Sequence, residues 1–364
     1  MHLPPGPRNI VQLLKMLSLR KKNPIKLYEE VFERYGDIVY FQLGPYKFAM
    51  LNDAEAIEQV LQTESKNYTK SSGYQRFALI VGNGLLVSEG ETWKRQRRLM
   101  SWAFSSKHIE KIYPVMTDQT LEMIRRWKNK EVLDLAEEMN QLTLQVISVS
   151  MFGKSQLNDS RDIRHSLQNM LKYLQTTRHL WIQLFLSPLP FIKHKKTLAL
   201  KIETALPTPT ARNFFGSIEA MTENVNGMIE ERKAKGVNEN FLDAMIQATD
   251  AEDQTKMSNK QLRDEAVNMM IAGHETTANA LTWTWHQLLK HPVVLAKVKD
   301  EIHSVVKGSA PTFEEISQLV YTKAVFEESM RLYPPFWRIS RTNLEDTRIK
   351  GFDIPAGTSI IASI

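Results

Sequence analysis

The sequence predicts a predominantly α-helical protein with small β-sheet elements at both ends. Three observations support this fold class. Apolar residues recur at helical spacing through almost the whole middle of the chain, strand-like runs are confined to its first and last parts, and one capped helix of exceptional length follows Ser258. The 364 residues contain no repeat, low-complexity tract or flexible linker, so we expect a single continuous domain over residues 1–364.

The first part of the chain predicts a helix and a β-hairpin. Residues 25–35 have helical spacing and stop at Gly36, a common helix terminator. Two strand-like runs, 38–43 and 47–51, flank the turn dipeptide Gly44-Pro45 and therefore predict a hairpin. Asp53 then predicts the start of a short helix through Leu61, because its carboxylate can accept from the first free amides.

The middle of the chain predicts a series of helices, and strands return only near the last residues. The predicted helices cover residues 92–104, 109–127, 139–152, 163–176 and 211–234. Residues 348–350 and 358–361 predict two strands around a turn at 354–357.

The longest predicted helix starts at Ser258, which forms a capping box with Gln261, and ends at Lys290 before Pro292. At 1.5 Å per residue, positions 259–290 span roughly 48 Å, enough to cross a domain. The apolar positions lack heptad regularity, which indicates a buried central helix rather than a coiled coil. They are Leu262, Ala266, Met269, Met270, Leu281, Leu288 and Leu289.

The midpoint of this helix has an unusual composition. Gly273 costs about 1 kcal/mol relative to alanine in a helix interior, and it would let a flat cofactor approach the backbone. A threonine hydroxyl can bond the preceding turn and open the helix locally, which predicts a groove for a small ligand. Glu275 beside Thr276 would place a proton carrier next to a hydroxyl there. The alternative is a glycine that serves helix packing beside back-bonded threonines.

Three further motifs involve basic side chains. Trp93 and Arg97 are four residues apart and so share a helical face. Their indole N–H and guanidinium are donors suited to a carboxylate. The alternative is an exposed basic face of the helix. Glu328 and Arg331 align on a helix that ends at Tyr333-Pro334-Pro335. Arg341 and Arg338 follow, and a strand with solvated arginines is the alternative for them.

Together these motifs resemble the cytochrome P450 family, the haem-thiolate monooxygenases, over essentially the whole chain. The resemblance implies a cytochrome P450 fold with a long central helix, a helical bundle and small sheets. It implies two carboxylate contacts to haem, one at Trp93 and Arg97 and one at Arg341 with Arg338 as a further candidate. The implied haem-binding residues are Trp93, Arg97, Ala272, Gly273, Thr276 and Arg341, and the implied catalytic residues are Glu275 and Thr276.

The resemblance implies that one oxygen atom from O2 is inserted into a lipophilic substrate with haem b as the cofactor. The chain has no cysteine, so we expect the iron ligand beyond residue 364, the C-terminal haem-binding part to be missing, and no metal ligand within these residues. We expect such a fragment to be inactive. The alternative is an inert helical scaffold, or a binder of apolar ligands, without haem.

The implied electron donor is external: a ferredoxin, a flavodoxin-like domain or a flavoprotein reductase. Lys94, Arg95 and Arg98 are candidate docking charges, with a solvated helix face as the alternative. The substrate entrance is expected along residues 68–85 and 181–211.

Charge and hydropathy limit which other partners and which cellular location we expect. The 47 Lys and Arg against 41 Asp and Glu give a net charge of +6, but the basic residues are scattered, so nucleic acid is not an expected partner. No run approaches the ~20 apolar residues of a transmembrane helix, and the most apolar one, 181–192, is too short; we expect a cytoplasmic protein. Gly82-Asn83-Gly84 lacks the third glycine of a dinucleotide-binding turn, because residue 87 is Val.

Overall fold

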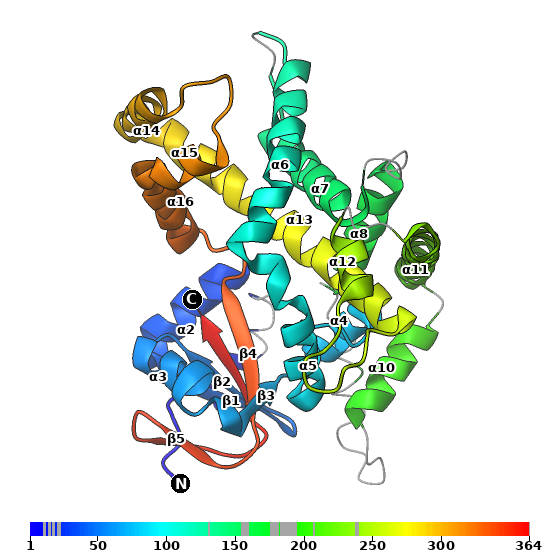
Figure 1. Cartoon of the computed structure of the whole chain (residues 1–364). Coiled ribbons are helices and arrows are strands. Elements are labelled where there is room, and N and C mark those ends of the chain that lie inside the picture. The colour runs from blue at the N-terminus through cyan, green and yellow to red at the C-terminus, as the bar shows by residue number, and fades with distance from the viewer. Residues whose placement is uncertain are drawn as a thin grey trace. The chain divides into compact units, whose positions relative to one another are not determined.

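A computed structural model of the chain describes residues 1–9, 12–13, 16, 19, 23–129, 132–153, 160–174, 182, 195–206, 208–236 and 240–363. Helices form most of the structure and strands occur in two small sheets, which confirms the predicted fold class (Figure 1). The chain divides into two compact units. We call them the sheet unit (Met1–Leu79, Lys172–Arg212 and Trp337–Ile364) and the helical unit (Ile80–Leu171 and Asn213–Phe336). The single domain over residues 1–364 stays a prediction.

The sheet unit contains a five-stranded sheet in the order β1-β2-β7-β4-β3 and a separate pair, β5-β6. The strands are β1 (Ile38–Leu43), β2 (Tyr46–Leu51), β3 (Tyr68–Lys70), β4 (Arg338–Asn343), β5 (Thr347–Ile349), β6 (Phe352–Ile354) and β7 (Ser359–Ser363). The predicted hairpin is confirmed, since β1 and β2 are antiparallel around Gly44, whose φ of 57° suits glycine. Both predicted C-terminal strands exist. However, β5 pairs with β6, while β7 joins β2 in parallel and β4 in antiparallel.

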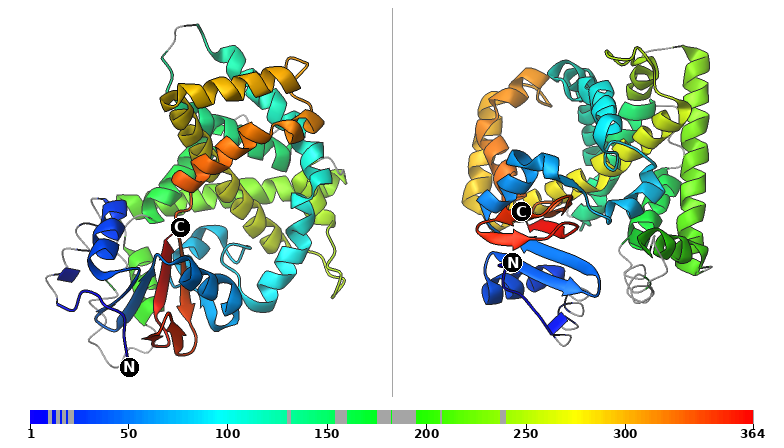
Figure 2. Two further views of the ribbon diagram at one scale, coloured as in Figure 1. Left: turned by 90° about the vertical axis from the view of Figure 1, so that its left-hand side faces the viewer. Right: turned by 90° about the horizontal axis from the view of Figure 1, so that it is seen from below.

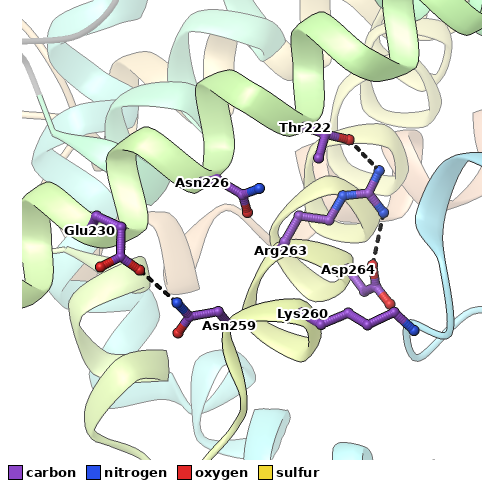
Figure 3. A pocket seen from close by; sticks show the side chains of 7 residues that line it. All are labelled: Thr222, Asn226, Glu230, Asn259, Lys260, Arg263 and Asp264. Carbon is purple, nitrogen blue, oxygen red and sulfur yellow. Dashed lines mark hydrogen bonds and ion pairs between the residues drawn. The ribbon is translucent and has the colours of Figure 1, made fainter.

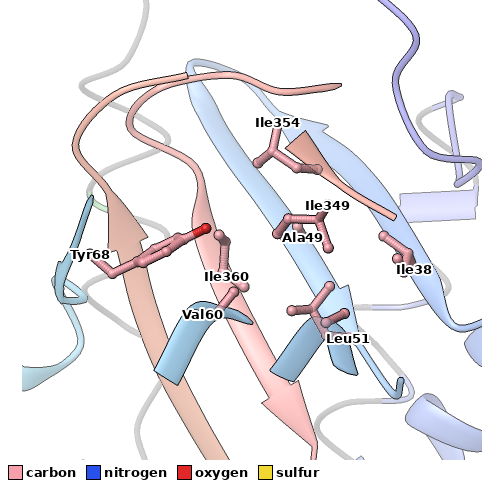
Figure 4. Packing of buried hydrophobic residues seen from close by; sticks show 9 residues of the cluster. Ile38, Ala49, Leu51, Val60, Tyr68, Ile349, Ile354 and Ile360 are labelled. Atoms are coloured by element: carbon pink, nitrogen blue, oxygen red, sulfur yellow. The ribbon is translucent and has the colours of Figure 1, made fainter. Parts of the chain in front are cut away.

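Side chains along β1 and β2 point alternately to the two faces of this hairpin, and apolar residues are buried on both faces. Ile38, Ala49 and Leu51 enter the cluster of Figure 4, together with residues of α3 (Ala54–Glu58), the π-helical turn η1 (Gln59–Thr63) and the C-terminal strands. Val39 and Met50 point the other way and pack against α2 (Pro24–Tyr35). This two-residue period places one apolar set on each side of the sheet. As predicted, α2 ends at Gly36, with φ of 86°, and Asp53 caps α3.

The helical unit is arranged around α13 (Asn259–Lys290), which packs along α7 (Leu135–Phe152) and against α16 (Val320–Leu332) (Figures 1 and 2). The predicted capping box of Ser258 and Gln261 is present. The other helices within this unit are α5 (Gly90–Ser101), η3 (Trp102–Phe104), α6 (Ser106–Arg126), α12 (Phe241–Gln247), α14 (Pro292–Val305) and α15 (Phe313–Gln318). The remaining helices are η2 (Ser65–Asn67), α4 (Tyr74–Val81), α8 (Ser160–Leu174), α10 (Lys195–Ala205) and α11 (Pro209–Lys235).

The first half of α13 matches the expected buried helix, and the second half matches it in part, since Leu288 is buried and Leu281 packs against a buried cluster. Leu262, Ala266 and Met270 are buried, but Leu289, for which we predicted an apolar contact, is 69% exposed. Besides α7, the helices α14 and α16 pack against α13. In the described ranges, no helix has both the length and the apolar character that crossing a membrane requires.

Buried Asn343 joins the end of β4 to the turn before β7. Its side-chain amide donates to the carbonyls of Ile354 (3.2 Å) and Pro355 (3.0 Å), and its Oδ1 accepts from the amide of Thr358 (2.8 Å). We therefore predict that Asn343→Ala lowers the free energy of unfolding by about 2–4 kcal/mol, because several buried backbone groups lose their partner. Urea unfolding followed by circular dichroism measures this. Asn213→Ala, at an exposed position of α11, is the control and should change stability by less than ~0.5 kcal/mol.

The N-terminus of α16 is capped from α14 by Glu301. The carboxylate accepts from the amides of Tyr321 and Thr322 and from the Thr322 hydroxyl, each at 2.7 Å. Burial opposes ionisation, but these hydrogen bonds outweigh it and lower the pKa of Glu301 below its ordinary 4.5. Its stabilising effect should therefore be complete above about pH 4.5 and disappear as pH falls through the lowered folded-state pKa.

We predict that Glu301→Gln is less stable than the wild type at neutral pH, and that the difference shrinks as the medium is acidified. Thermal unfolding of both proteins between pH 3 and 7 measures it. A difference that stays constant across this range would show that the carboxylate charge does not act on α16.

Candidate functional site

The middle of α13 keeps a regular helical backbone. The Thr276 hydroxyl donates to the Ala272 carbonyl, the side-chain bond that we expected. However, residues 259–290 are α-helical throughout, so the predicted local opening of the helix is wrong. The physical reason is that a carbonyl oxygen has two lone pairs. The Ala272 carbonyl can therefore accept from the Thr276 hydroxyl without losing its backbone partner.

Gly273 faces α7. A Cβ added to this glycine would lie 3.3 Å from the Cδ1 atom of Ile147. This is tighter than ordinary contact, so the missing side chain lets α7 approach α13 closely. The geometry thus gives Gly273 the helix-packing role that the sequence left open beside the cofactor role.

A second face of α13 carries residues spaced by four: Asp264, Asn268, Ala272 and Thr276. We call this row the 264–276 ridge. Residues four apart in an α-helix lie above one another, about 6 Å apart along the axis. Asp264 and Asn268 are buried, whereas Ala272 is exposed and Thr276 half-buried. The ridge is therefore covered at its start and open at its end.

Glu275 lies beside the open end of this ridge as a half-buried acid. Within the described ranges its carboxylate has no hydrogen-bond or ion-pair partner. Burial raises the pKa of Glu275 above the ordinary value of 4.5, because the charged form loses hydration. Such a carboxyl group retains its proton to higher pH than a solvated glutamate, which suits a proton donor.

Trp93 and Arg97 share one face of α5. The Arg97 guanidinium carbon lies 5.1 Å from the centre of the Trp93 indole, at a cation–π distance. Three neighbouring cations pair with acids: Lys94 with Glu91, Arg95 with Asp253, and Arg98 with Asp250 and Glu252. Arg97 has no acidic partner among the described residues. Its charge is therefore available for an external anion.

The predicted docking charges are engaged within the chain. The Arg95 side chain is only 17% exposed and donates to Asp253 and to the hydroxyl of Thr255, and Arg98 contacts Asp250 at 3.2 Å. Hydrogen bonds from the amide of Glu252 and from Arg98 lower the pKa of Asp250, so that carboxylate is ionised. These acids neutralise both arginines, which favours a structural role for them.

Arg341 lies in β4, directly opposite Lys70 of β3. Its guanidinium donates to the neighbouring Ser340 carbonyl and contacts no acid among the described residues. Arg338 is three positions away and so points to the opposite face of the strand, where it lies 5.3 Å from the Trp337 ring. The two arginines therefore cannot serve one anion from the same face of the sheet.

The remaining sequence motif is formed but exposed. Arg331 donates twice to the Glu328 carboxylate, at 2.7 Å each, and both side chains are more than half exposed. Among the described residues, no further hydrogen bond or ion pair joins this pair to another side chain. A contact that the sequence analysis missed is the stacking of Trp283 on Tyr333, with ring centres 4.2 Å apart, which fixes the end of α16 on α13.

The structure groups the predicted residues into three separate sets. Glu275 and Thr276 with Ala272 and Gly273 form one turn of α13, and Trp93 with Arg97 forms a pair on α5. Both sets belong to the helical unit, and no hydrogen bond, ion pair or ring contact joins them among its described residues. Arg341 belongs to the sheet unit. Most of the predicted entrance segment between residues 181 and 194 lies outside the described residues.

A pocket of about 520 Å³ lies between α11 and the start of α13 (Figure 3). Arg263 donates to Thr222 and to Asp264, and Asn259 donates to Glu230. None of the seven residues that line this pocket is among the predicted site residues.

Comparison with known proteins gives consistent results. The family model described as Cytochrome P450 matches residues 4–364. A cyclooctat-9-en-7-ol 5-monooxygenase from Streptomyces melanosporofaciens is 30% identical over 90% of this chain and 68% of its own length. Pentalenene oxygenase from Streptomyces avermitilis is 27% identical, over 90% of this chain and 69% of its own length. A bifunctional cytochrome P450/NADPH--P450 reductase from Bacillus cereus is 26% identical, over 95% of this chain and 32% of its own length.

The family match covers nearly every residue, and the long capped helix, the terminal sheet strands and the pair of Trp93 and Arg97 are all compatible with it. The chain belongs to the cytochrome P450 family.

Proposed function

We propose that the protein acts as a haem-dependent monooxygenase, which inserts one oxygen atom from O2 into a lipophilic substrate. The observation that carries this proposal is the open end of the 264–276 ridge. There an exposed alanine, a half-buried hydroxyl and an acid with a raised pKa occupy one helical turn. The small side chain of Ala272 would let a flat ring system approach the helix. Glu275 and Thr276 would supply a proton beside that ring system.

The residues present fit the carboxylates of haem b. Arg97 and Arg341 are cations without an acidic partner among the described residues, and Trp93 adds an indole N–H donor beside Arg97. When bound through a thiolate, haem supplies the activation of dioxygen. The chain contains no cysteine, so that thiolate is not among its 364 residues.

Glu275 and Thr276 would move protons at this site. At neutral pH the raised pKa of Glu275 keeps more of its carboxyl group protonated than in a solvated glutamate. The Thr276 hydroxyl, already oriented by its bond to the Ala272 carbonyl, would pass a proton to the reacting oxygen. Half-burial of both side chains limits competing water.

Electrons would come from a ferredoxin, a flavodoxin-like domain or a flavoprotein reductase. A relative whose name joins a cytochrome P450 to an NADPH--P450 reductase supports a reductase of this kind. Two other relatives are named for cyclooctat-9-en-7-ol and pentalenene, and a lipophilic substrate agrees with those names. A cytoplasmic location belongs to the same proposal, since a chain without cysteine suits a reducing compartment.

We predict that Arg97→Ala weakens haem binding by about 10- to 100-fold, because one charge-assisted hydrogen bond to a carboxylate is lost. Spectrophotometric titration with haem measures this affinity. Lys94→Ala, which removes a neighbouring exposed cation already paired with Glu91, is the matched control and should bind haem like the wild type. Equal affinities in both variants would remove Arg97 from the haem site, and no haem binding by any of them would favour the inert scaffold.

In a haem-loaded protein that also carries the thiolate ligand expected beyond residue 364, we predict that Thr276→Ala diverts electrons from product to reduced oxygen, and that Glu275→Gln lowers turnover by about 100-fold. Thr277→Ala, at the exposed neighbouring position, should have little effect. The ratio of product formed to electron donor consumed measures the coupling. Wild-type turnover should also fall as pH rises through the raised pKa of Glu275, a dependence that Glu275→Gln lacks. Unchanged coupling in Thr276→Ala would contradict the relay.

A further inference from the structure

The turn between α12 and α13 directs its acids at α5. We call residues 249–256 the acidic turn. Its own backbone holds its shape, since the Asp250 amide donates to the Thr255 carbonyl at 2.9 Å and the Gln254 amide donates to the Asp250 carbonyl at 3.0 Å. The Asp250 carboxylate also accepts from the amide of Glu252 at 2.8 Å. These bonds keep the carboxylates of the turn in a fixed arrangement.

Asp250 is the acid that two arginines of α5 share. Its side chain is fully buried, and its Oδ2 atom lies 3.2 Å from Arg98 and 3.8 Å from Arg95. Each arginine has one further acid, Asp253 for Arg95 at 3.0 Å and Glu252 for Arg98 at 2.8 Å. A buried carboxylate is costly unless cations and hydrogen bonds surround it, so these contacts hold α5 firmly on the acidic turn.

A second polar contact holds another side of α5. The Gln96 side chain donates to the Asn83 carbonyl at 2.9 Å and accepts from the Ser88 hydroxyl at 2.7 Å. Together with Arg95 and Arg98 on the acidic turn, this contact limits rotation of the helix about its own axis.

Trp93 and Arg97 lie on the side of α5 that faces away from the acidic turn. With 3.6 residues per turn, the midpoint of Trp93 and Arg97 is about 150° around the helix from the midpoint of Arg95 and Arg98. Among the described residues, no hydrogen bond, ion pair or ring contact joins Trp93 or Arg97 to this turn. Asp250 therefore acts on that pair through the helix and not by touching it.

Small rotations of α5 are large on the scale of a hydrogen bond. A side-chain atom about 6 Å from the helix axis moves by about 1 Å when the helix rotates by about 10°. A charge-assisted bond between nitrogen and oxygen is about 2.7–2.9 Å long, and lengthening it by about 1 Å would break it. The rotation of α5 thus decides whether Trp93 and Arg97 can donate to one carboxylate together.

We infer that Asp250 is a positioning residue: by holding Arg95 and Arg98, it fixes the rotation of α5 at which Trp93 and Arg97 bind one haem carboxylate. This inference deepens the proposed function and rests on it for the identity of the ligand. The contact between Asp250 and α5 does not itself depend on haem.

The dependence of binding on the haem carboxylates tests this role. Ferric haem and its dimethyl ester, in which both carboxylates are esterified, are titrated into the full chain and followed by absorption. We expect Asp250→Asn to weaken the binding of haem by about tenfold, because the Arg97 bond to a carboxylate is lost, and to change the binding of the ester by less than about twofold.

Two further variants complete this titration. Asp243→Asn removes the charge of another buried acid, 3.6 Å from Arg232, and as the matched control should bind both compounds like the wild type. Arg98→Ala removes the anchor from the side of α5 and leaves Asp250 paired with Arg95. It should weaken the binding of haem more than that of the ester, and it keeps the test valid if Asp250→Asn does not fold.

A double variant shows whether Asp250 acts through Arg97. Asp250→Asn combined with Arg97→Ala should bind haem at most about threefold more weakly than Arg97→Ala alone, because a neutral bond from Trp93 is all that remains to be positioned. Losses that multiply in the double variant, or equal weakening of haem and ester in Asp250→Asn, would overturn the role of Asp250 alone. A wild type that binds no haem would overturn the proposed function together with this role.

Discussion

The close packing of α7 on α13 determines which faces of the central helix remain available. Gly273 has no side chain where Ile147 approaches, so α7 covers that side of α13. The 264–276 ridge lies on another face of α13, where segments other than α7 can contact it. In its first half, Asp264 accepts from the backbone amide of Asn83, whereas its second half, at Ala272 and Thr276, is not buried. The proposed oxygenase chemistry depends on this division, because the proton-carrying residues follow directly after the covered part.

Polar side chains, rather than apolar contacts alone, fix the segments that connect the elements. Asp264 and Glu265 bind backbone amides of the turn before α5, Glu301 binds those at the start of α16, and Asn343 binds the turn before β7. In each case a side chain far away in the sequence satisfies backbone groups that a loop or helix end leaves unpaired. Leaving such groups without partners is costly, so these contacts hold each segment in one conformation.

Features encoded by neighbouring residues could be predicted from the sequence. The capping box of Ser258, the end of α2 at Gly36 and the hairpin around Gly44 each depend on a few adjacent positions, and all are present. The pairing of Trp93 with Arg97 likewise follows from helical spacing. The predicted opening of α13 failed because a threonine hydroxyl can share a carbonyl that is already bonded.

Contacts between distant segments could not be predicted in this way. Nothing near Arg95 or Arg98 in the sequence indicates the acids at 250–253 that neutralise them, and nothing near Gly82 indicates Asp264. The strand order could not be predicted for the same reason, since β7 lies between β2 and β4, which come from opposite ends of the chain. Such pairings are decided by which faces meet when the chain folds.

The central claim is that haem lies against the open end of the 264–276 ridge. Paramagnetic broadening of alanine methyl signals by ferric iron in the haem-loaded protein tests it most directly. Ala272 is exposed on this ridge, whereas Ala278 is buried in a cluster with Met139 and Leu142 of α7. The account predicts strong broadening of the Ala272 methyl signal and a much smaller effect at Ala278. Equal broadening, or stronger broadening at Ala278, would contradict it.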